Sequence, residues 1–189
     1  MPDELERRVF DAVRRHACEG GLPAASLTVG LDVSEFGALS GHVFQGAGDA
    51  ADVQAPPTDE RPAMLSPLIA MLWAHRTGDA PWTRLMAGTI SCAAFGARHL
   101  WQDLGAAGRP EVTALLERHF RTLAARNVRN LKWKHHLFQC LGAQLGLSDL
   151  RPPRCDGCEE QPLCFPDQPI TVRFGSLHGG TKAKQEKAA

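Results

Sequence analysis

The stretch DELERRVFDAVRRHAC, residues 3–18, decides the fold class of this chain. Asp3 and Glu6 are spaced as a capping box, in which each side chain binds the backbone N–H of the other residue. Apolar and weakly polar side chains then recur along one helical stripe: Leu5, Val9, Ala12, Val13 and His16. Gly20 and Gly21 end the pattern. The stretch therefore predicts an amphipathic helix at the start of the chain.

Helical patterns also dominate the rest of the sequence. They cover residues 34–44, 66–76, 80–97, 109–127 and 130–147. We expect Ser34 to cap the first of them, and Pro67 and Pro110 stand near helix starts, where a missing N–H costs little. Only ASLTVGL (residues 25–31) and ITVRF (residues 170–174) look like strands. The sequence therefore predicts an all-α fold.

The chain of 189 residues fits one domain. A stretch rich in Pro and Asp, residues 48–62, is typical of a loop. We expect a single helical domain over residues 1–168 that includes an irregular cysteine loop at residues 150–168. Residues 169–189 form an extension whose polar end, GGTKAKQEKAA, is predicted to be disordered.

Charge and hydropathy narrow the class of partner. The 21 basic and 21 acidic residues cancel, so no global field attracts nucleic acid or an acidic membrane. The charged start lacks the apolar core of a signal peptide. The most apolar stretch, residues 63–75, is interrupted by Pro67 and is shorter than the ~18 residues that a membrane span requires. We therefore expect a cytoplasmic protein, in which clustered cysteines are more often metal ligands or redox groups than disulfides.

The segment RCDGCEEQPLCF, residues 154–165, carries the strongest chemical signal. Cys155, Cys158 and Cys164 have the spacing C-x2-C-x5-C. Thiolates are soft ligands, which favours zinc, copper(I) or an iron–sulfur cluster. Closed zinc sites and cubane clusters ordinarily take four protein ligands. Three local thiolates therefore indicate either a distant fourth ligand or an open coordination position. The alternative is a loop with only a structural zinc ion, or one whose cysteines are simply reduced thiols.

Three motifs in this order extend the pattern beyond the cysteine loop. They are HLWQDLG (residues 99–105), HFRTLAARNVRNLKWK (residues 119–134) and CDGCEEQPLCF (residues 155–165). A weaker likeness runs through GLDVSEFGAL and WAHRTG farther upstream. With these motifs the chain resembles the NifQ family of nitrogen-fixation proteins over residues 25–166.

The resemblance implies a molybdenum carrier. Proteins of this family bind an iron–sulfur cluster that can include molybdenum, and they supply the metal for the nitrogenase iron–molybdenum cofactor. The expected acceptors are the cofactor-assembly scaffold complex and the nitrogenase iron protein. The sequence shows no nucleophile–base pair and no phosphate-binding loop, so we expect a metal carrier and not an enzyme. The rival interpretations are a zinc-binding structural or interaction protein and an iron–sulfur electron-transfer protein.

The chain departs from the family pattern at the first cysteine of the loop. The family's loop usually reads C-x4-C-x2-C-x5-C, and Leu150 stands at its first position. The family also often has a cysteine near Gly142, whereas this chain has Cys140. On a helix, Cys140 shares a face with Leu137 and Gln144. Cys140 is therefore either a small core residue or a candidate fourth ligand.

Two histidines are further candidates for the fourth ligand. His136 precedes Cys140 by one helical turn, and its alternative is an exposed or half-buried helix residue. His99 is either a ligand or a hydrogen-bond partner of Asp103 at i+4. The remaining cysteines, Cys18 and Cys92, lie in apolar helical patterns, and we expect both in the core.

Basic residues gather just before the cysteine loop. They are Arg126, Arg129, Lys132 and Lys134, with Arg151 and Arg154 beside the loop itself. Molybdate and thiolate-bound clusters are anionic, so nearby cations would lower the cost of assembling them. The alternatives are a solvated helix face and nucleic-acid binding, which the zero net charge and the lack of a recognisable module disfavour.

Overall fold

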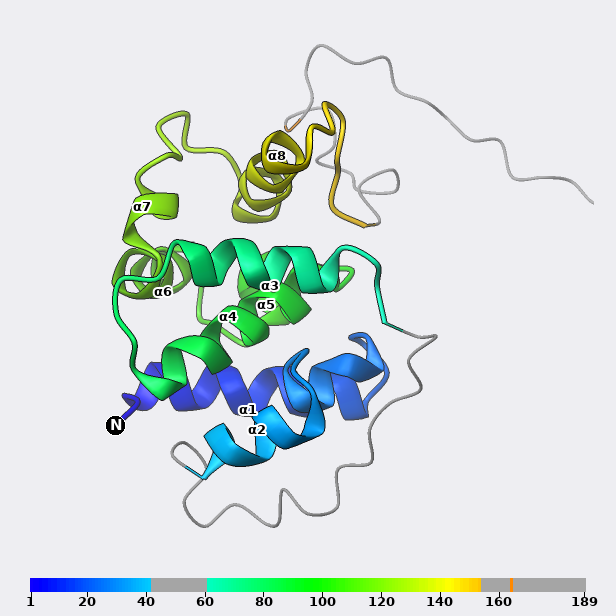
Figure 1. Ribbon diagram of the computed structural model, residues 1–189, viewed down its shortest axis with the longest axis vertical. Helices are drawn as coiled ribbons and strands as arrows, with labels where there is room; N and C mark the ends of the chain where they lie inside the picture. The colour runs from blue at the N-terminus through cyan, green and yellow to red at the C-terminus, as the bar shows by residue number, and fades with distance from the viewer. Residues whose placement is uncertain (42–60, 154–163, 165–189) are drawn as a thin grey trace, which may run out of the picture.

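The computed structural model describes residues 1–41, 61–153 and 164 (Figure 1). The elements are α1 (Glu4–Cys18), the 3-10 helix η1 (Ala24–Thr28), α2 (Val33–Ser40), α3 (Leu65–Ala74), α4 (Pro81–Ala94), α5 (Leu100–Asp103), α6 (Arg109–His119), α7 (Arg121–Ala124) and α8 (Trp133–Leu145). No strand occurs in the described ranges, so the prediction of an all-α fold is confirmed. The predicted extension and most of the predicted cysteine loop lie outside the described residues, as does the strand candidate at residues 170–174.

Helix α4 is the centre of the fold. It contacts α1, α2, α3, α5 and η1 (Figure 1), and its side chains from Leu85 to Ala94 are all buried. A Cβ at Gly88 would lie 2.0 Å from the carbonyl oxygen of Val29, so this crossing requires glycine. Cys92 is fully buried, as predicted, and burial raises the pKa of its thiol to about 12.

The N-terminal helix forms as its sequence indicates. The Asp3 carboxylate accepts the Glu6 N–H at 2.9 Å, and the Glu6 carboxylate accepts the Asp3 N–H at 2.7 Å. Val9 and Val13 of the predicted stripe are fully buried. Cys18, however, is exposed, and its assignment to the core was wrong. The buried stripe ends at the preceding residue, Ala17, and the next residue on a helix points about 100° away.

Local hydrogen bonds correct two further predictions. The cap of α2 is Asp32, whose carboxylate accepts from the Glu35 N–H and from the Ser34 hydroxyl, both at 2.8 Å. The acid two residues earlier therefore replaces Ser34 as the cap. Residues 25–31 are no strand, because they form η1 and a turn in which the Thr28 hydroxyl donates to the Leu31 carbonyl at 2.7 Å.

The predicted helix over residues 109–127 is broken into α6 and α7. The break is at Phe120, whose backbone leaves the helical region (φ −139°, ψ 48°) while its side chain is fully buried. Thr77 enters the gap: its N–H donates to the His119 carbonyl at 2.7 Å, and its hydroxyl accepts the Arg121 N–H at 3.2 Å. A segment distant in sequence therefore satisfies the backbone groups that the break releases.

Helix α8 packs on α3 at the end of the molecule opposite α1 and α2 (Figure 1). Trp133, Leu137 and Leu141 form its buried face, and Phe138 meets the ring of Phe95 edge-on at 5.5 Å. No helix in the described ranges is both long and apolar enough to cross a membrane. Helix α5 lies in the middle of the molecule, where it contacts α1, α4 and α6, and α7 contacts α6 (Figure 1).

Candidate metal centre

The predicted thiolate ligands are only partly described. Cys155 and Cys158 lie outside the described residues, so their assignment as ligands stays a prediction. Cys164 is described and half-buried. It lies at a hollow of about 390 Å³ between the approach to α5 and the first turn of α8, which we call the α5–α8 hollow. The hollow places one of the three predicted ligands against the helical domain.

Nitrogen donors and cations surround Cys164 in the α5–α8 hollow. The polar residues that line it include Arg98, His99, Arg109, Lys132, Lys134 and His135. None of its described lining residues is acidic. The surroundings therefore favour an anionic occupant over a free cation. Within the described ranges, no group of three or more His, Cys, Asp or Glu side chains is placed to hold a metal ion.

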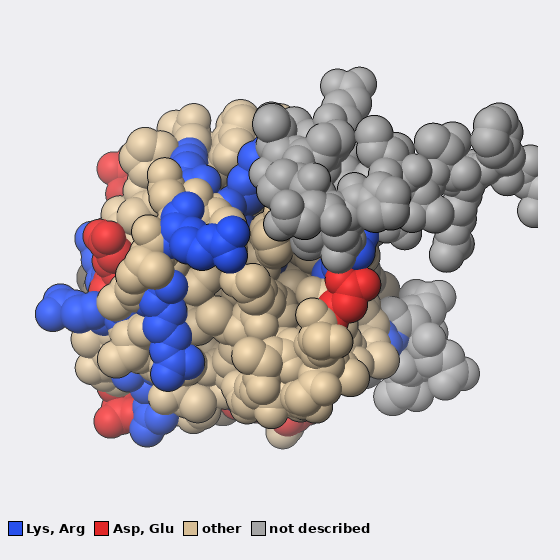
Figure 2. All heavy atoms as spheres, turned by 90° about the horizontal axis from the view of Figure 1, so that it is seen from above, with Lys and Arg blue, Asp and Glu red and all other residues tan. Residues whose placement is uncertain are grey.

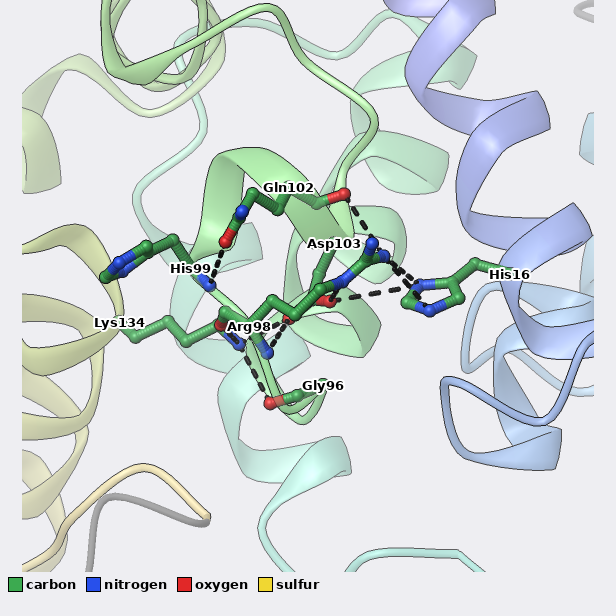
Figure 3. A network of polar contacts seen from close by, with 7 residues as sticks. All are labelled: His16, Gly96, Arg98, His99, Gln102, Asp103 and Lys134. Carbon is green, nitrogen blue, oxygen red and sulfur yellow. Dashed lines mark hydrogen bonds and ion pairs between the residues drawn. The ribbon is translucent and has the colours of Figure 1, made fainter. Parts of the chain in front are cut away.

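A buried carboxylate joins the two walls of this hollow. Asp103 is only 1% exposed. It accepts hydrogen bonds from the backbone and the guanidinium of Arg98, both at 3.1 Å, and from the Lys134 ammonium at 2.7 Å (Figure 3). His16 of α1 approaches it at 3.9 Å. Because Lys134 belongs to α8 and Asp103 to α5, this network fixes the two helices relative to each other.

The backbone just before α5 leaves room for the Asp103 carboxylate. A Cβ at Gly96 would lie 2.3 Å from Asp103 Oδ2, so only glycine leaves room for the side chain. The Gly96 carbonyl also accepts from Lys134 Nζ at 2.9 Å. The sequence pattern did not reveal this network, because Lys134 lies 31 residues from Asp103 and 38 from Gly96, and His16 comes from the distant helix α1. The only local signal was the i to i+4 spacing of His99 and Asp103.

His99 stands on the wall of the hollow. The His99 backbone N–H donates to Gln102 Oε1 at 3.0 Å, and this hydrogen bond caps the start of α5. The His99 ring points away from the Asp103 network (Figure 3). The Asp103 carboxylate is held by Arg98 and Lys134, whereas the Asp103 N–H donates to the His99 carbonyl at 3.0 Å. His99 thus shares a hollow with Cys164, and its assignment as a ligand stays a prediction.

Two further groups of the hollow were not singled out by the sequence. His135 is half-buried, and burial lowers the pKa of its imidazole, with a further lowering by the positive charge of Arg129. A neutral imidazole is the form that binds metals. Arg109 lies over the Trp133 ring at 5.7 Å and donates to the Leu131 carbonyl at 2.8 Å. Its guanidinium is therefore held in place at the hollow.

Cys140 and His136 line a different hollow, on the side of α8 that faces the α7–α8 loop. The Cys140 sulfur lies 3.6 Å from His136 Nε2, which is also 3.1 Å from the Leu123 carbonyl oxygen. His136 is buried and Cys140 is half-buried. Burial raises the pKa of Cys140 and lowers that of His136. The structure therefore does not bring these two candidates to the hollow that holds Cys164.

The positions at which the chain departs from the family pattern lie next to each other. A Cβ at Gly142 would be 3.1 Å from Leu150 Cβ and 2.5 Å from the Leu147 carbonyl oxygen. Leu150 packs against the core. A bulky apolar side chain and a glycine thus share the space at which the family pattern suggests cysteines.

The described ranges thus form an all-helical fold in which a cysteine, two imidazoles and several cations line one hollow, and this lining suits an anionic occupant. The sequence model of the NifQ family matches residues 9–166. The chain is 30% identical to Protein NifQ of Rhodobacter capsulatus over 78% of its own length and 81% of that protein. It is also 33% identical to a Protein NifQ homolog of Sinorhizobium fredii, over 86% of this chain and 72% of the relative.

A third similar protein is Protein NifQ of Azotobacter vinelandii, with 38% identity over 52% of this chain and 50% of that protein. No solved structure matches the chain. The chain belongs to the NifQ family. Membership gives it a role in nitrogen fixation.

Proposed function

We propose that this chain binds an iron–sulfur or molybdenum–iron–sulfur cluster through Cys155, Cys158 and Cys164, and supplies molybdenum for nitrogenase iron–molybdenum cofactor biosynthesis. It acts as a carrier in the cytoplasm and not as an enzyme. The acceptors are the cofactor-assembly scaffold complex and the nitrogenase iron protein. The cluster is the chain's cargo, and the cluster leaves the chain together with the molybdenum.

The observation that carries this proposal is the position of Cys164. Its sulfur stands half-buried at a hollow lined by His99, His135 and several cations, with no acid among the described lining residues. A thiolate-bound cluster carries negative charge, which the nearby cations would offset. Thiolate and neutral imidazole are both suitable ligands for iron. The donor set of the hollow therefore fits the proposed cargo.

The Asp103 network supports the same function indirectly. It fixes α5 and α8, which carry His99 and His135. A site on rigid elements holds its ligands more precisely than a site on loops alone. His99 is the candidate for the fourth ligand that lies at the same hollow as Cys164. A histidine or an exogenous ligand at the fourth position would exchange more readily than a fourth cysteine.

The experiment is metal analysis of the full chain, produced with molybdate feeding and purified without oxygen. We expect brown protein that contains iron, sulfide and molybdenum. Cys164→Ala should lower the content of both metals severalfold, whereas Cys18→Ala, which changes an exposed cysteine at the end of α1, should leave it unchanged. Equal metal content in both variants would contradict the proposal.

A second candidate function is a zinc-stapled interaction protein. Leu150 favours it, because this partly buried residue stands where the family's loop has its first cysteine and packs against the core. Colourless protein with one zinc per chain would support this alternative. Iron with a reversible redox couple but without molybdenum uptake would indicate an electron-transfer protein instead.

The departure at Leu150 also provides a test of the ligand set. Leu150→Cys should place a fourth thiol at the start of the loop and raise the iron content retained after gel filtration. Leu150→Ala is the matched control, since it removes the same apolar contact without adding a donor. If the cysteine variant retains no more iron than the alanine variant, the fourth position is filled by another ligand.

A further inference from the structure

The second hollow, on the other side of α8, has a composition that the cysteine loop does not explain. It has a volume of about 520 Å³ and lies between the end of α3, the α7–α8 loop and α8; we call it the α7–α8 hollow. Its polar lining includes His75, Arg126, Arg129, His136, Gln139 and Cys140. No acidic side chain is among its described lining residues.

Within the described ranges, the two arginines of this hollow lack the carboxylate partners that several other arginines have. Many others are paired with carboxylates, such as Arg8 with Glu111, Arg84 with Glu35 and Arg98 with Asp103. Within the described ranges, neither Arg126 nor Arg129 has a hydrogen bond or an ion pair from its guanidinium. Their charges are therefore available to an anion.

The loop that carries the arginines has a fixed shape. The side chain of Asn127 accepts the Leu131 N–H at 2.8 Å and donates to the Leu131 carbonyl at 3.0 Å. Asn130 takes a left-handed conformation with φ 52°, which asparagine tolerates better than most residues. Arg126 directly precedes Asn127, and Arg129 lies between Asn127 and Leu131, so the backbones of both arginines are held in place before any ligand arrives. Such preorganisation reduces the entropy cost of binding.

The floor of the hollow presents neutral groups. Burial lowers the pKa of His75, with a further lowering by Arg126, and burial also lowers the pKa of His136. Burial raises the pKa of Cys140, against a smaller opposite effect of Arg126. Imidazoles and a protonated thiol do not repel an anion, and the Arg126 charge reaches all three groups. Figure 2, which looks onto the α7–α8 end of the molecule, shows Lys and Arg side chains grouped on this face.

We propose that the α7–α8 hollow is a binding site for a tetrahedral oxyanion dianion, held by the guanidinium groups of Arg126 and Arg129. Guanidinium matches oxyanions through paired N–H donors. Gln139 lines the same hollow, and its side-chain amide is a further N–H donor. Molybdate, sulfate and phosphate share this chemistry. The site is a different hollow from the one that Cys164 lines, and its proposed ligands include none of the three loop cysteines.

The test is isothermal titration of the full-length protein with sodium molybdate, sodium sulfate and sodium phosphate in separate runs. We expect saturable binding of at least one of them, weakened by added sodium chloride. The double variant Arg126→Gln/Arg129→Gln should lose roughly tenfold or more in affinity. Arg121→Gln is the matched control, because it removes one exposed arginine of α7 that does not line the hollow, and it should stay within about twofold.

Competition between the anions identifies the source of the ligand. Preference for molybdate over sulfate would assign the site to the cargo metal, and equal displacement would assign it to oxyanions in general; both support the proposal. Saturable binding of none of the three anions, or unchanged affinity in the double variant with a wild-type unfolding midpoint, would overturn it.

A second variant separates this proposal from the proposed function. Cys155→Ala/Cys158→Ala/Cys164→Ala should lose the cluster and keep the affinity for the oxyanion. If that variant loses oxyanion binding as well, the anion is bound at the cysteine loop and the α7–α8 hollow is not its site. Failure of the loop to bind a cluster would leave the oxyanion titration unaffected.

Discussion

The cationic side chains at the two ends of the helical domain differ in whether they have carboxylate partners. Where α1 meets α6, Arg118 contacts Asp3 and Glu6, and the His119 ring lies 2.7 Å from the buried Glu6 carboxylate. At the α7–α8 hollow, Arg126 and Arg129 have no carboxylate partner within the described ranges. In the first arrangement the cations are paired within the fold, whereas in the second the two guanidinium groups have no partner among the described residues.

This difference separates groups that hold the fold from groups that are free to bind. A buried charge without its partner is costly, so charges that stabilise a fold are paired within it. Exposed cations that line a hollow without partners cost little and attract anions. We therefore expect substitutions at the α1–α6 contact to change stability, and substitutions at the α7–α8 hollow to change binding.

The largest expected effect is at the α1–α6 contact. His119→Ala removes one of the two partners that lie 2.7 Å from the carboxylate of Glu6, which is 2% exposed. We expect a loss of about 3 kcal/mol in the free energy of unfolding, measured by urea denaturation. Arg8→Ala, which breaks an exposed pair with Glu111, is the control and should cost clearly less. Equal losses in the two variants would show that burial does not determine how much these pairs contribute to the free energy of unfolding.

The next effect concerns the Asp103 network, in which paired charge supports a candidate site. Gly96→Ala would place a Cβ 2.3 Å from Asp103 Oδ2, and the displaced carboxylate would lose Arg98 or Lys134. We expect a loss of about 2 kcal/mol by thermal unfolding. Gly37→Ala in α2 is the matched control, since a Cβ there meets no atom within 4 Å, and it should stabilise by about 0.5–1 kcal/mol. A neutral Gly96→Ala would refute the tight fit.

The third effect is the pH dependence of the α1–α6 contact. Burial lowers the pKa of His119, although the hydrogen bond to Glu6 opposes the shift. Below the ordinary histidine pKa of about 6.5, the unfolded chain gains a proton that the folded protein resists. The contribution of His119 to stability should therefore be complete above this pH and fall below it, by at most about 1.4 kcal/mol per pH unit for this one group.

The measurement is urea unfolding between about pH 7.5 and about pH 5.5. His119→Gln should show a shallower fall than the unsubstituted protein, without abolishing it, because burial also lowers the pKa values of His75, His135 and His136. Stability that rises on acidification would contradict the sign of the shift.

The smallest expected effect on the free energy of unfolding is at the α7–α8 hollow. Arg126→Gln removes an exposed cation that has no partner in the described ranges, so the free energy of unfolding should change by less than about 0.5 kcal/mol. Arg118→Gln, at the paired end, should cost more. If Arg126→Gln destabilises as much as Arg118→Gln does, the arginine supports the fold and its charge is not free for a ligand.

Local signals explain which parts of the fold the sequence could predict. The capping box of α1 lies within four residues and forms as its spacing indicates. The break at Phe120 could not be predicted in this way, because its hydrogen bonds come from Thr77, more than 40 residues away. The cap of α2 was misplaced by two residues because Asp32 and Ser34 are both good capping residues.

The candidate site shows the same division. The cysteine spacing indicated a metal loop, and the i to i+4 pattern correctly put His136 beside Cys140. The side of α8 on which this pair lies is set by packing of Trp133, Leu137 and Leu141, which turns it away from Cys164. Only the tertiary structure therefore distinguishes His99, at the α5–α8 hollow, from the other two candidates for the fourth ligand.

The most direct test of the central claim is X-ray absorption at the molybdenum edge. The full chain would be loaded by molybdate feeding, purified without oxygen and freed of loosely held oxyanion by gel filtration. Binding in a thiolate-ligated cluster predicts sulfur neighbours around molybdenum, lost in Cys164→Ala and kept in Arg126→Gln/Arg129→Gln. Molybdenum with oxygen neighbours alone, or a sulfur signal that Cys164→Ala leaves intact, would contradict the claim that this cysteine carries the cargo.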